Sequence, residues 1–313
     1  MKRSITLLLL FIIGLGLPAC STNPATGKSQ LNMLGESQEI EIGKEAAPKF
    51  LKGNGGPVPS PQIRAYVTKL GNRLASLSER PKLPWEFHVL DSKVINAFAL
   101  PGGKVFISRG LLSKMTNEAQ LAGVLGHEVG HVTGQHIGQQ MTKQMIVKVG
   151  LSVVSEVSDA QWIQVMGGTS GNLYLLSYGR SQETQADALG VRYMTKAGYN
   201  PVGQIQVMEI LKAAAGGSRS GEFFATHPHP QTRIETLERL IPEKYPGYDS
   251  DFDRYKFMEH EFKVNILAPL AKLPAPKHGA PKKKAALNSK QYPKWYAAAQ
   301  THNLCYCYGQ SHP

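Results

Sequence analysis

The sequence predicts an α+β fold that is mostly helical, with a small antiparallel sheet beside a central helix. Three observations support this prediction. Apolar residues recur at helical spacing in long segments along most of the chain. Short segments of alternating apolar residues lie close together within residues 85–108. Apolar residues also make up 42% of the 313 residues, which is enough for a packed core.

The first elements are two amphipathic helices, at residues 37–51 and 60–77. The glycines and prolines between them interrupt a continuous helix. Alternating segments then predict three strands, at residues 85–90, 94–100 and 104–108. Because a proline and two glycines form a turn before the last strand, we expect these strands to form an antiparallel sheet.

A buried helix is predicted at residues 118–136, where Leu121, Val124, Leu125 and Val132 recur at helical spacing. After an interruption at Gly134, helical spacing continues to residue 157. Residues 158–178 mix glycines with apolar residues, which predicts a mobile loop over the site. Three more helices follow, at residues 181–197, 201–215 and 231–240, and the last is expected to end before Pro242.

The N-terminal residues 1–19 have the charged head and short apolar run of an export signal. They end in a segment that resembles the lipobox of bacterial lipoproteins, Leu17-Pro18-Ala19-Cys20. The resemblance implies that Cys20 is acylated and that the protein is periplasmic, anchored in the outer membrane. The alternative is ordinary secretion with an unmodified Cys20. The polar residues 20–35 are expected to form a tether between the lipid and the domain.

The formal charge of +12 is concentrated at the C-terminus, where residues 274–313 hold six lysines and no acidic residue. Without this tail and the leader the chain is close to neutral, so nucleic-acid binding has little support. The tail is rich in Lys and Pro and lacks an apolar period, which predicts disorder. A single folded domain is therefore expected at residues 36–273.

The metal prediction comes from the motif His127-Glu128-Val129-Gly130-His131, which places two imidazoles one helical turn apart. This spacing suits one tetrahedral zinc ion, and Glu128 can reach a water bound to it. The alternative is a pair of histidines on a helix surface. Gly126 and Gly130 weigh against it, because glycine disfavours a helix and is usually retained for close approach.

A catalytic zinc site needs three protein ligands, and Glu183 on the predicted helix 181–197 is the best candidate for the third. Asp187 follows at i+4 on the same face and can hydrogen-bond a ligating imidazole, although the sequence does not say which one. The alternative is that both are solvated surface acids.

Four motifs follow one another within residues 34–240: Asn96-Ala97-Phe98 with Pro101-Gly102-Gly103, then His127 to His131, then Arg180 with Glu183, Ala186 and Asp187, then Thr226-His227-Pro228 with Arg233. In combination they resemble the HtpX-like and CAAX-prenyl-protease-like zinc metallopeptidases of the gluzincin type, especially their periplasmic lipoprotein branch. The resemblance implies a zincin-like fold with one Zn²⁺ per chain. It implies that the zinc ligands are His127, His131 and Glu183 and that Glu128 is the general base.

The resemblance also implies roles for residues outside the zinc motif. Asn96 would lie on an edge strand that pairs with an extended substrate. His227 would stand near the metal, either stabilising the oxyanion or closing the open position as a gate. Arg180 and Arg233 match residues that support the ligands together with Asp187. Taken alone, His227 precedes a proline and is an ordinary turn histidine.

The function that follows is a zinc-dependent endopeptidase acting on misfolded or misassembled cell-envelope proteins. The alternative is a chaperone or assembly factor whose zinc site is self-inhibited by His227. A third hypothesis is a tethered adaptor that works through the lysine-rich tail. Some family members carry C-terminal helical repeats that bind an outer-membrane assembly machine, but residues 274–313 cannot form such repeats.

Overall fold

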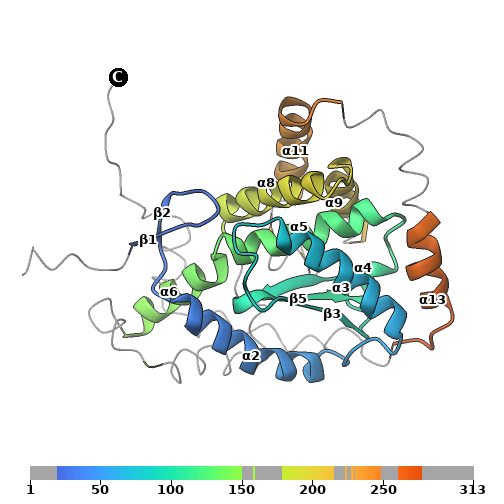
Figure 1. Cartoon of the computed structure of the whole chain (residues 1–313), viewed down its shortest axis with the longest axis horizontal. Helices are drawn as coiled ribbons and strands as arrows, with labels where there is room; N and C mark the ends of the chain where they lie inside the picture. The colour runs from blue at the N-terminus through green and yellow to red at the C-terminus, as the bar shows by residue number, and fades with distance from the viewer. Residues whose placement is uncertain are drawn as a thin grey trace, which may run out of the picture. The chain divides into compact units, whose positions relative to one another are not determined.

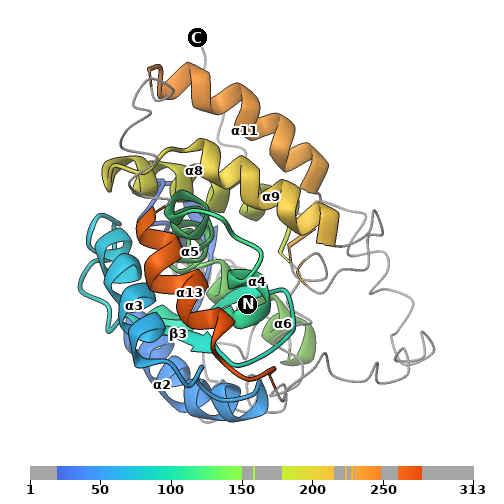
Figure 2. The same cartoon turned by 90° about the vertical axis from the view of Figure 1, so that its right-hand side faces the viewer.

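The computed structural model describes residues 20–149, 158, 178–214, 223, 227–228, 230–247 and 260–276 (Figure 1). The predicted leader, nearly all of the predicted mobile loop and residues 277–313 of the tail lie outside these residues. In Figures 1 and 2 the elements are layered: the sheet lies between helix α2 and helix α5, and helices α8 and α11 lie beyond α5. The predicted fold class is confirmed.

Helices α2 (Glu36–Gly53) and α3 (Pro61–Ser76) form where they were expected. Helix α3 begins cleanly because the Ser60 side chain accepts a hydrogen bond from the Ile63 backbone N–H, and Pro61 occupies the first turn. Its apolar face packs against strand β3 and helix α5 in the main core. These helices therefore brace the sheet and the central helix.

The sheet contains β3 (Glu86–Leu90), β4 (Ala97–Leu100) and β5 (Lys104–Ser108) in the order β3-β5-β4. The β4–β5 pair is antiparallel, as predicted, because Pro101–Gly103 turns the chain tightly between them. Gly102 has φ +69°, and a Cβ there would lie 2.6 Å from the Ile40 Cα.

The β3–β5 pair is parallel, so the sheet is mixed rather than purely antiparallel. The reason is that β5 lies between β3 and β4, so β3 does not pair with the strand that follows it in sequence. Strand β4 is consequently an edge strand of this sheet, as the resemblance implied.

Helices α5 (Glu118–Thr133) and α8 (Arg180–Lys196) are the central helical pair. Helix α5 is buried around its whole circumference from Ala119 to Thr133, not only along the predicted stripe. It ends at Thr133, and a turn in which Gln135 has φ +53° separates it from α6 (His136–Val149). His136, predicted to end the first helix, therefore begins the second.

The remaining described helices are α4 (Arg109–Leu112), α9 (Val202–Ala214), α11 (Pro230–Lys244), the π-helical turn η5 (Lys263–Leu267) and α13 (Ala268–Ala271). Helix α11 passes through Pro242 instead of ending before it. Arg109 donates hydrogen bonds to the backbone oxygens of Leu273 and Pro274 and pairs with Asp91 at 2.9 Å. The contact with Pro274 lies one residue beyond the domain boundary predicted at residue 273.

The predicted tether is partly structured. Strands β1 (Cys20–Thr22) and β2 (Ser29–Leu31) form an antiparallel hairpin. The Asn23 side chain donates to the backbone oxygen of Gly134 at 3.0 Å, and Gln139 donates to the Gln30 side chain at 2.8 Å. The hairpin therefore packs against the junction of α5 and α6.

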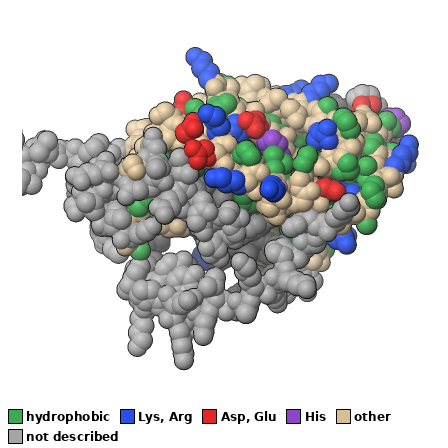
Figure 3. All heavy atoms as spheres, turned by 90° about the horizontal axis from the view of Figure 1, so that it is seen from below, with side chains coloured by type: hydrophobic (Ala, Val, Ile, Leu, Met, Phe, Trp, Pro, Cys, Tyr) green, Lys and Arg blue, Asp and Glu red, His purple; other side chains and the backbone are tan. Residues whose placement is uncertain are grey.

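Acidic and basic side chains are mixed with apolar ones on the face seen in Figure 3. Within the described part of the chain, no helix has both the length and the apolar character needed to cross a membrane.

Candidate metal centre

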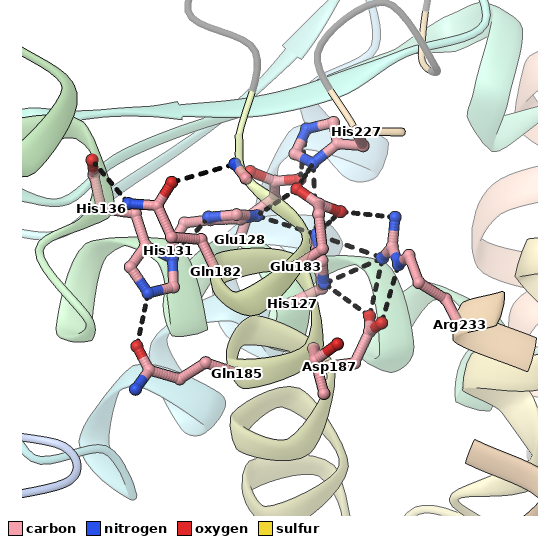
Figure 4. Close-up of polar contacts among 12 residues, drawn as sticks. His127, Glu128, His131, His136, Gln182, Glu183, Gln185, Asp187, His227 and Arg233 are labelled. Atoms are coloured by element: carbon pink, nitrogen blue, oxygen red, sulfur yellow. Dashed lines mark hydrogen bonds and ion pairs between the residues drawn. The ribbon is translucent and has the colours of Figure 1, made fainter. Parts of the chain in front are cut away.

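Four buried side chains converge beside the sheet (Figure 4). His127 and His131 come from α5, Glu183 comes from α8, and His227 comes from just before α11. One nitrogen or oxygen atom of each lies within 4.8 Å of the corresponding atoms of the others. Segments about 100 positions apart in the sequence therefore meet at one point.

The spacing of these atoms fits a zinc ion. A tetrahedral zinc with bonds of about 2.0–2.1 Å places its ligand atoms about 3.3 Å apart. The His127 and His131 Nε2 atoms are 3.0 Å apart, and the Glu183 Oε1 atom is 3.4 Å from His131 Nε2. The His227 Nδ1 atom is 3.0 Å from Glu183 Oε1 and 3.3 Å from His127 Nε2. Imidazole and carboxylate are also ligands that zinc accepts.

Glu183 can reach the histidines because α5 and α8 approach closely. A Cβ added to Gly130 would lie 2.8 Å from the Ala186 backbone oxygen, and one added to Gly126 would lie 3.0 Å from that of Gly190. The expectation that these glycines serve a close approach is confirmed.

Asp187 orients His127. The Asp187 Oδ1 atom lies 2.8 Å from His127 Nδ1, which leaves His127 Nε2 facing the cluster. Arg233 donates hydrogen bonds to the same carboxylate from Nε at 2.7 Å and from Nη2 at 2.6 Å. Burial alone would raise the pKa of Asp187, but Arg233 and His127 hold the pKa at about 2. The structure thus identifies the histidine that the sequence left open.

Arg233 also touches the proposed third ligand. Its Nη1 atom lies 2.6 Å from Glu183 Oε2. Burial alone would raise the pKa of Glu183, but Arg233 and His227 outweigh it and hold the pKa well below the usual range. Glu183 is therefore a carboxylate in this buried site.

Glu128 is fully buried beside the cluster, with its Oε1 atom 3.8 Å from His227 Nε2. Neither of its carboxylate oxygens has a hydrogen-bond partner among the described residues. Burial raises the pKa of Glu128, so this carboxylate is a stronger base than an exposed glutamate. A buried carboxylate without partners next to a metal-ligand set has the position of a general base.

Three residues that the sequence did not suggest lie against the histidines. The Tyr178 ring stacks on His131 with centroids 3.8 Å apart, and the Phe223 ring stacks on His227 at 4.5 Å. His136 Nδ1 lies 2.8 Å from His131 Nδ1. His136 follows His131 by five positions, which is not the same face of a continuous helix, so helical periodicity gives no signal for this contact.

Two residues predicted for the site, Asn96 and Arg180, are not part of the cluster of converging ligand atoms. Asn96 is buried immediately before β4, and its side-chain amide has no hydrogen-bond partner within the described ranges. Arg180 is exposed at the first position of α8. No hydrogen bond or ion pair connects its side chain to another residue that the structure describes. A supporting role for Arg180 stays a prediction.

Comparison with known proteins agrees with this site. The profile of peptidase family M48 matches residues 61–241. The chain is 29% identical to the beta-barrel assembly-enhancing protease of Escherichia coli over 255 residues, covering 77% of this chain and 52% of that protein. It is 33% identical to the mitochondrial metalloendopeptidase OMA1 of Danio rerio over 243 residues, covering 71% of this chain and 50% of that protein. The chain spans about half the length of these relatives. The family match extends over more than half of the chain, which therefore belongs to peptidase family M48, a family of zinc-dependent metallopeptidases.

Proposed function

We propose that the protein is a zinc-dependent endopeptidase in which His127, His131 and Glu183 hold one zinc ion and Glu128 is the general base. The convergence of these ligand atoms beside the unpartnered Glu128 carboxylate is the observation that supports it most strongly. Zinc supplies the Lewis acidity that polarises a peptide carbonyl and makes water more acidic.

The chain's own residues would perform the proton transfer and the positioning. Glu128 takes a proton from the attacking water, for which its raised pKa is suited, and then delivers it to the leaving amine. Asp187 and Arg233 fix the orientation of His127 through the contacts at 2.8 Å and 2.6 Å. Because β4 is an edge strand, an extended substrate can pair with it and present its backbone near the cluster, with Asn96 immediately before that strand.

A specific contact supports the alternative of a self-inhibited site. His227 Nδ1 is one of the four converging atoms, so His227 can occupy the position that substrate or water would need. A chaperone or assembly factor with a closed zinc site would have this arrangement permanently. In an endopeptidase, His227 would have to move aside or act on the substrate oxyanion.

The substrates we propose are misfolded or misassembled cell-envelope proteins, and the location is the periplasmic face of the outer membrane. The export-signal and lipobox patterns that end at Cys20 support the location. The similarity to a protein named beta-barrel assembly-enhancing protease supports an envelope role.

The test uses the mature protein purified with zinc. We expect wild type to release peptides from a reduced, unfolded protein substrate, and Glu128→Gln to lose that activity while retaining zinc. If both release peptides equally slowly, the endopeptidase proposal fails and the closed-site alternative stands. Deletion of residues 274–313 is expected to leave peptide release intact, whereas the adaptor hypothesis requires the tail.

A further inference from the structure

The second ring nitrogen of His131 has its own partner, separate from the Asp187–Arg233 pair. His131 Nδ1 and His136 Nδ1 are 2.8 Å apart, and His136 Nε2 lies 2.5 Å from the side-chain oxygen of Gln185. Figure 4 shows His136 and Gln185 on one side of the cluster, with Asp187 and Arg233 on the other. His136 is fully buried, and Gln185 is half-buried.

The break between α5 and α6 creates this contact. In an uninterrupted helix, residues five positions apart lie about 140° apart around the axis, because each residue turns about 100°. Gln135 instead adopts φ +53°, and α6 starts at His136. The turn therefore directs the His136 ring back toward the ring of His131.

Hydrogen-bond chemistry determines which ring nitrogens of His131 and His136 carry a proton. A side-chain carbonyl oxygen only accepts, so His136 Nε2 must carry the proton that it donates to Gln185. The ring nitrogens of His136 face a histidine and an amide, and neither contact supplies a compensating negative charge. A neutral, singly protonated His136 ring then leaves its Nδ1 atom as an acceptor.

The short contact between the two Nδ1 atoms needs one proton, and it must come from His131. His131 is thereby held as the tautomer with its proton on Nδ1 and a lone pair on Nε2. That lone pair faces His127 Nε2 at 3.0 Å and Glu183 Oε1 at 3.4 Å, where the ligand atoms converge.

We propose that His136 is a positioning residue that, with Gln185, locks His131 in its metal-binding tautomer. Each imidazole of the zinc motif thus has a separate orienting partner: a charged one for His127 and a neutral one for His131. Because His136 and Gln185 are neutral, they orient the His131 ring without adding negative charge to a ligand set that already contains Glu183. The proposal rests on the proposed role of His131 as a zinc ligand.

The alternative is that His136 is an ordinary core histidine, whose hydrogen bonds contribute only to the stability of the fold. It predicts that substitutions change the free energy of unfolding only. The tautomer proposal predicts that zinc affinity follows the ability of the residue to accept a proton from His131, whatever the change in stability.

The experiment measures zinc affinity by competition with a chromophoric chelator, and urea unfolding of the metal-free protein. We expect His136→Leu to weaken zinc binding by about 10- to 100-fold, as expected when a partner of a metal ligand is removed. His136→Asn, whose side-chain oxygen can accept from His131, is expected to recover most of that loss. Imidazole ¹⁵N shifts are expected to report His131 protonated at Nδ1 in the metal-free wild type.

A substitution of the half-buried Gln185 tests the tautomer proposal independently if His136→Leu does not fold. Gln185→Lys offers His136 Nε2 only a donor, so the His136 tautomer that accepts from His131 is lost and zinc affinity is expected to fall. Thr184→Ala is the matched control on α8, because among the described residues the Thr184 hydroxyl donates a hydrogen bond only to the Arg180 backbone oxygen.

Equal zinc affinity in wild type, His136→Leu and Gln185→Lys would overturn the tautomer proposal. So would losses that follow the unfolding free energy alone, with no recovery in His136→Asn. Failure of the underlying function is recognised separately, because His131→Ala would then bind zinc as tightly as wild type.

Discussion

Gly130 lies against the backbone of Ala186, where a Cβ on the glycine would be only 2.8 Å from the alanine carbonyl oxygen. Gly130 neighbours His131 in α5, and Ala186 is one turn from Glu183 in α8. The spacing of the two helices therefore sets the distance between two proposed zinc ligands. Small residues at this contact are a requirement of the site as well as of the fold.

Gly130→Ala should damage the site through this contact. We expect the substitution to lower the free energy of unfolding by about 1–3 kcal/mol, the usual cost of overpacking. Because the helices must separate, zinc affinity should fall as well. Urea unfolding and chelator competition measure the two effects.

Gly53→Ala is the matched control, since Gly53 is also helical and a Cβ there meets nothing within 4 Å. It is expected to leave the protein as stable as wild type, or slightly more so. A Gly130→Ala protein with unchanged stability and zinc affinity would contradict the argument about helix spacing.

Arg233 is expected to be essential for the electrostatics of the site. Arg233→Gln leaves the buried carboxylates of Glu183 and Asp187 without their cation, at a cost of about 3–5 kcal/mol for an unpaired buried charge. Zinc affinity should also drop, by about 10- to 100-fold. Calorimetric zinc titration and thermal unfolding check both effects.

Arg180→Gln is the control for Arg233→Gln. Arg180 also matches the family resemblance, but it is exposed at the start of α8. We expect it to behave as wild type in both measurements. If the two variants behave alike, the assignment of the supporting role to Arg233 alone is wrong.

Helical spacing predicted the relationships between site residues that are close in sequence, whereas His227 and Arg233 were suggested only by the family resemblance. His127 and His131 share one face of a helix, with Glu128 about 100° round from His127, and Glu183 and Asp187 share one face of another helix. The distance between the two helices depends on the Gly130–Ala186 contact, which only the folded chain defines.

The pairing of the strands in the sheet was predicted only in part. The turn before β5 predicted its antiparallel pairing with β4 correctly, because a tight turn determines local pairing. The parallel pairing of β3 with β5 requires the chain to pass from one edge of the sheet to the other between β3 and β4, and the strand predicted at residues 94–100 does not indicate that passage. His136 was missed for a related reason, since a single left-handed residue, Gln135, reorients it.

Asp187 should make stability depend on pH in a defined window. Its folded-state pKa of about 2 lies below the value of about 3.9 for an unfolded aspartate, so the folded state favours the charged form. The resulting stabilisation, about 2–3 kcal/mol, is present above about pH 4 and is lost as the pH falls through about 2.

Asp187→Asn isolates this contribution in the metal-free protein. We expect wild type to be the more stable of the two at pH 7, and the difference to shrink as the pH is lowered from about 4 toward 2. Urea unfolding at a series of pH values measures it. A difference that stays constant over that range would show that the Asp187 carboxylate is not responsible.

His227 should control access to the zinc. Its Nδ1 atom lies among the converging ligand atoms, 3.3 Å from His127 Nε2, and the Phe223 ring stacks against its imidazole. Because this position closes the site, we expect His227→Ala to raise kcat/KM for an unfolded substrate and to weaken zinc binding modestly. Peptide release and zinc content are measured on the same samples, with Glu128→Gln, His227→Ala as the inactive double variant. An oxyanion-stabilising His227 would instead give a loss of about 10² to 10³ in kcat, because a preorganised donor would be gone from the transition state.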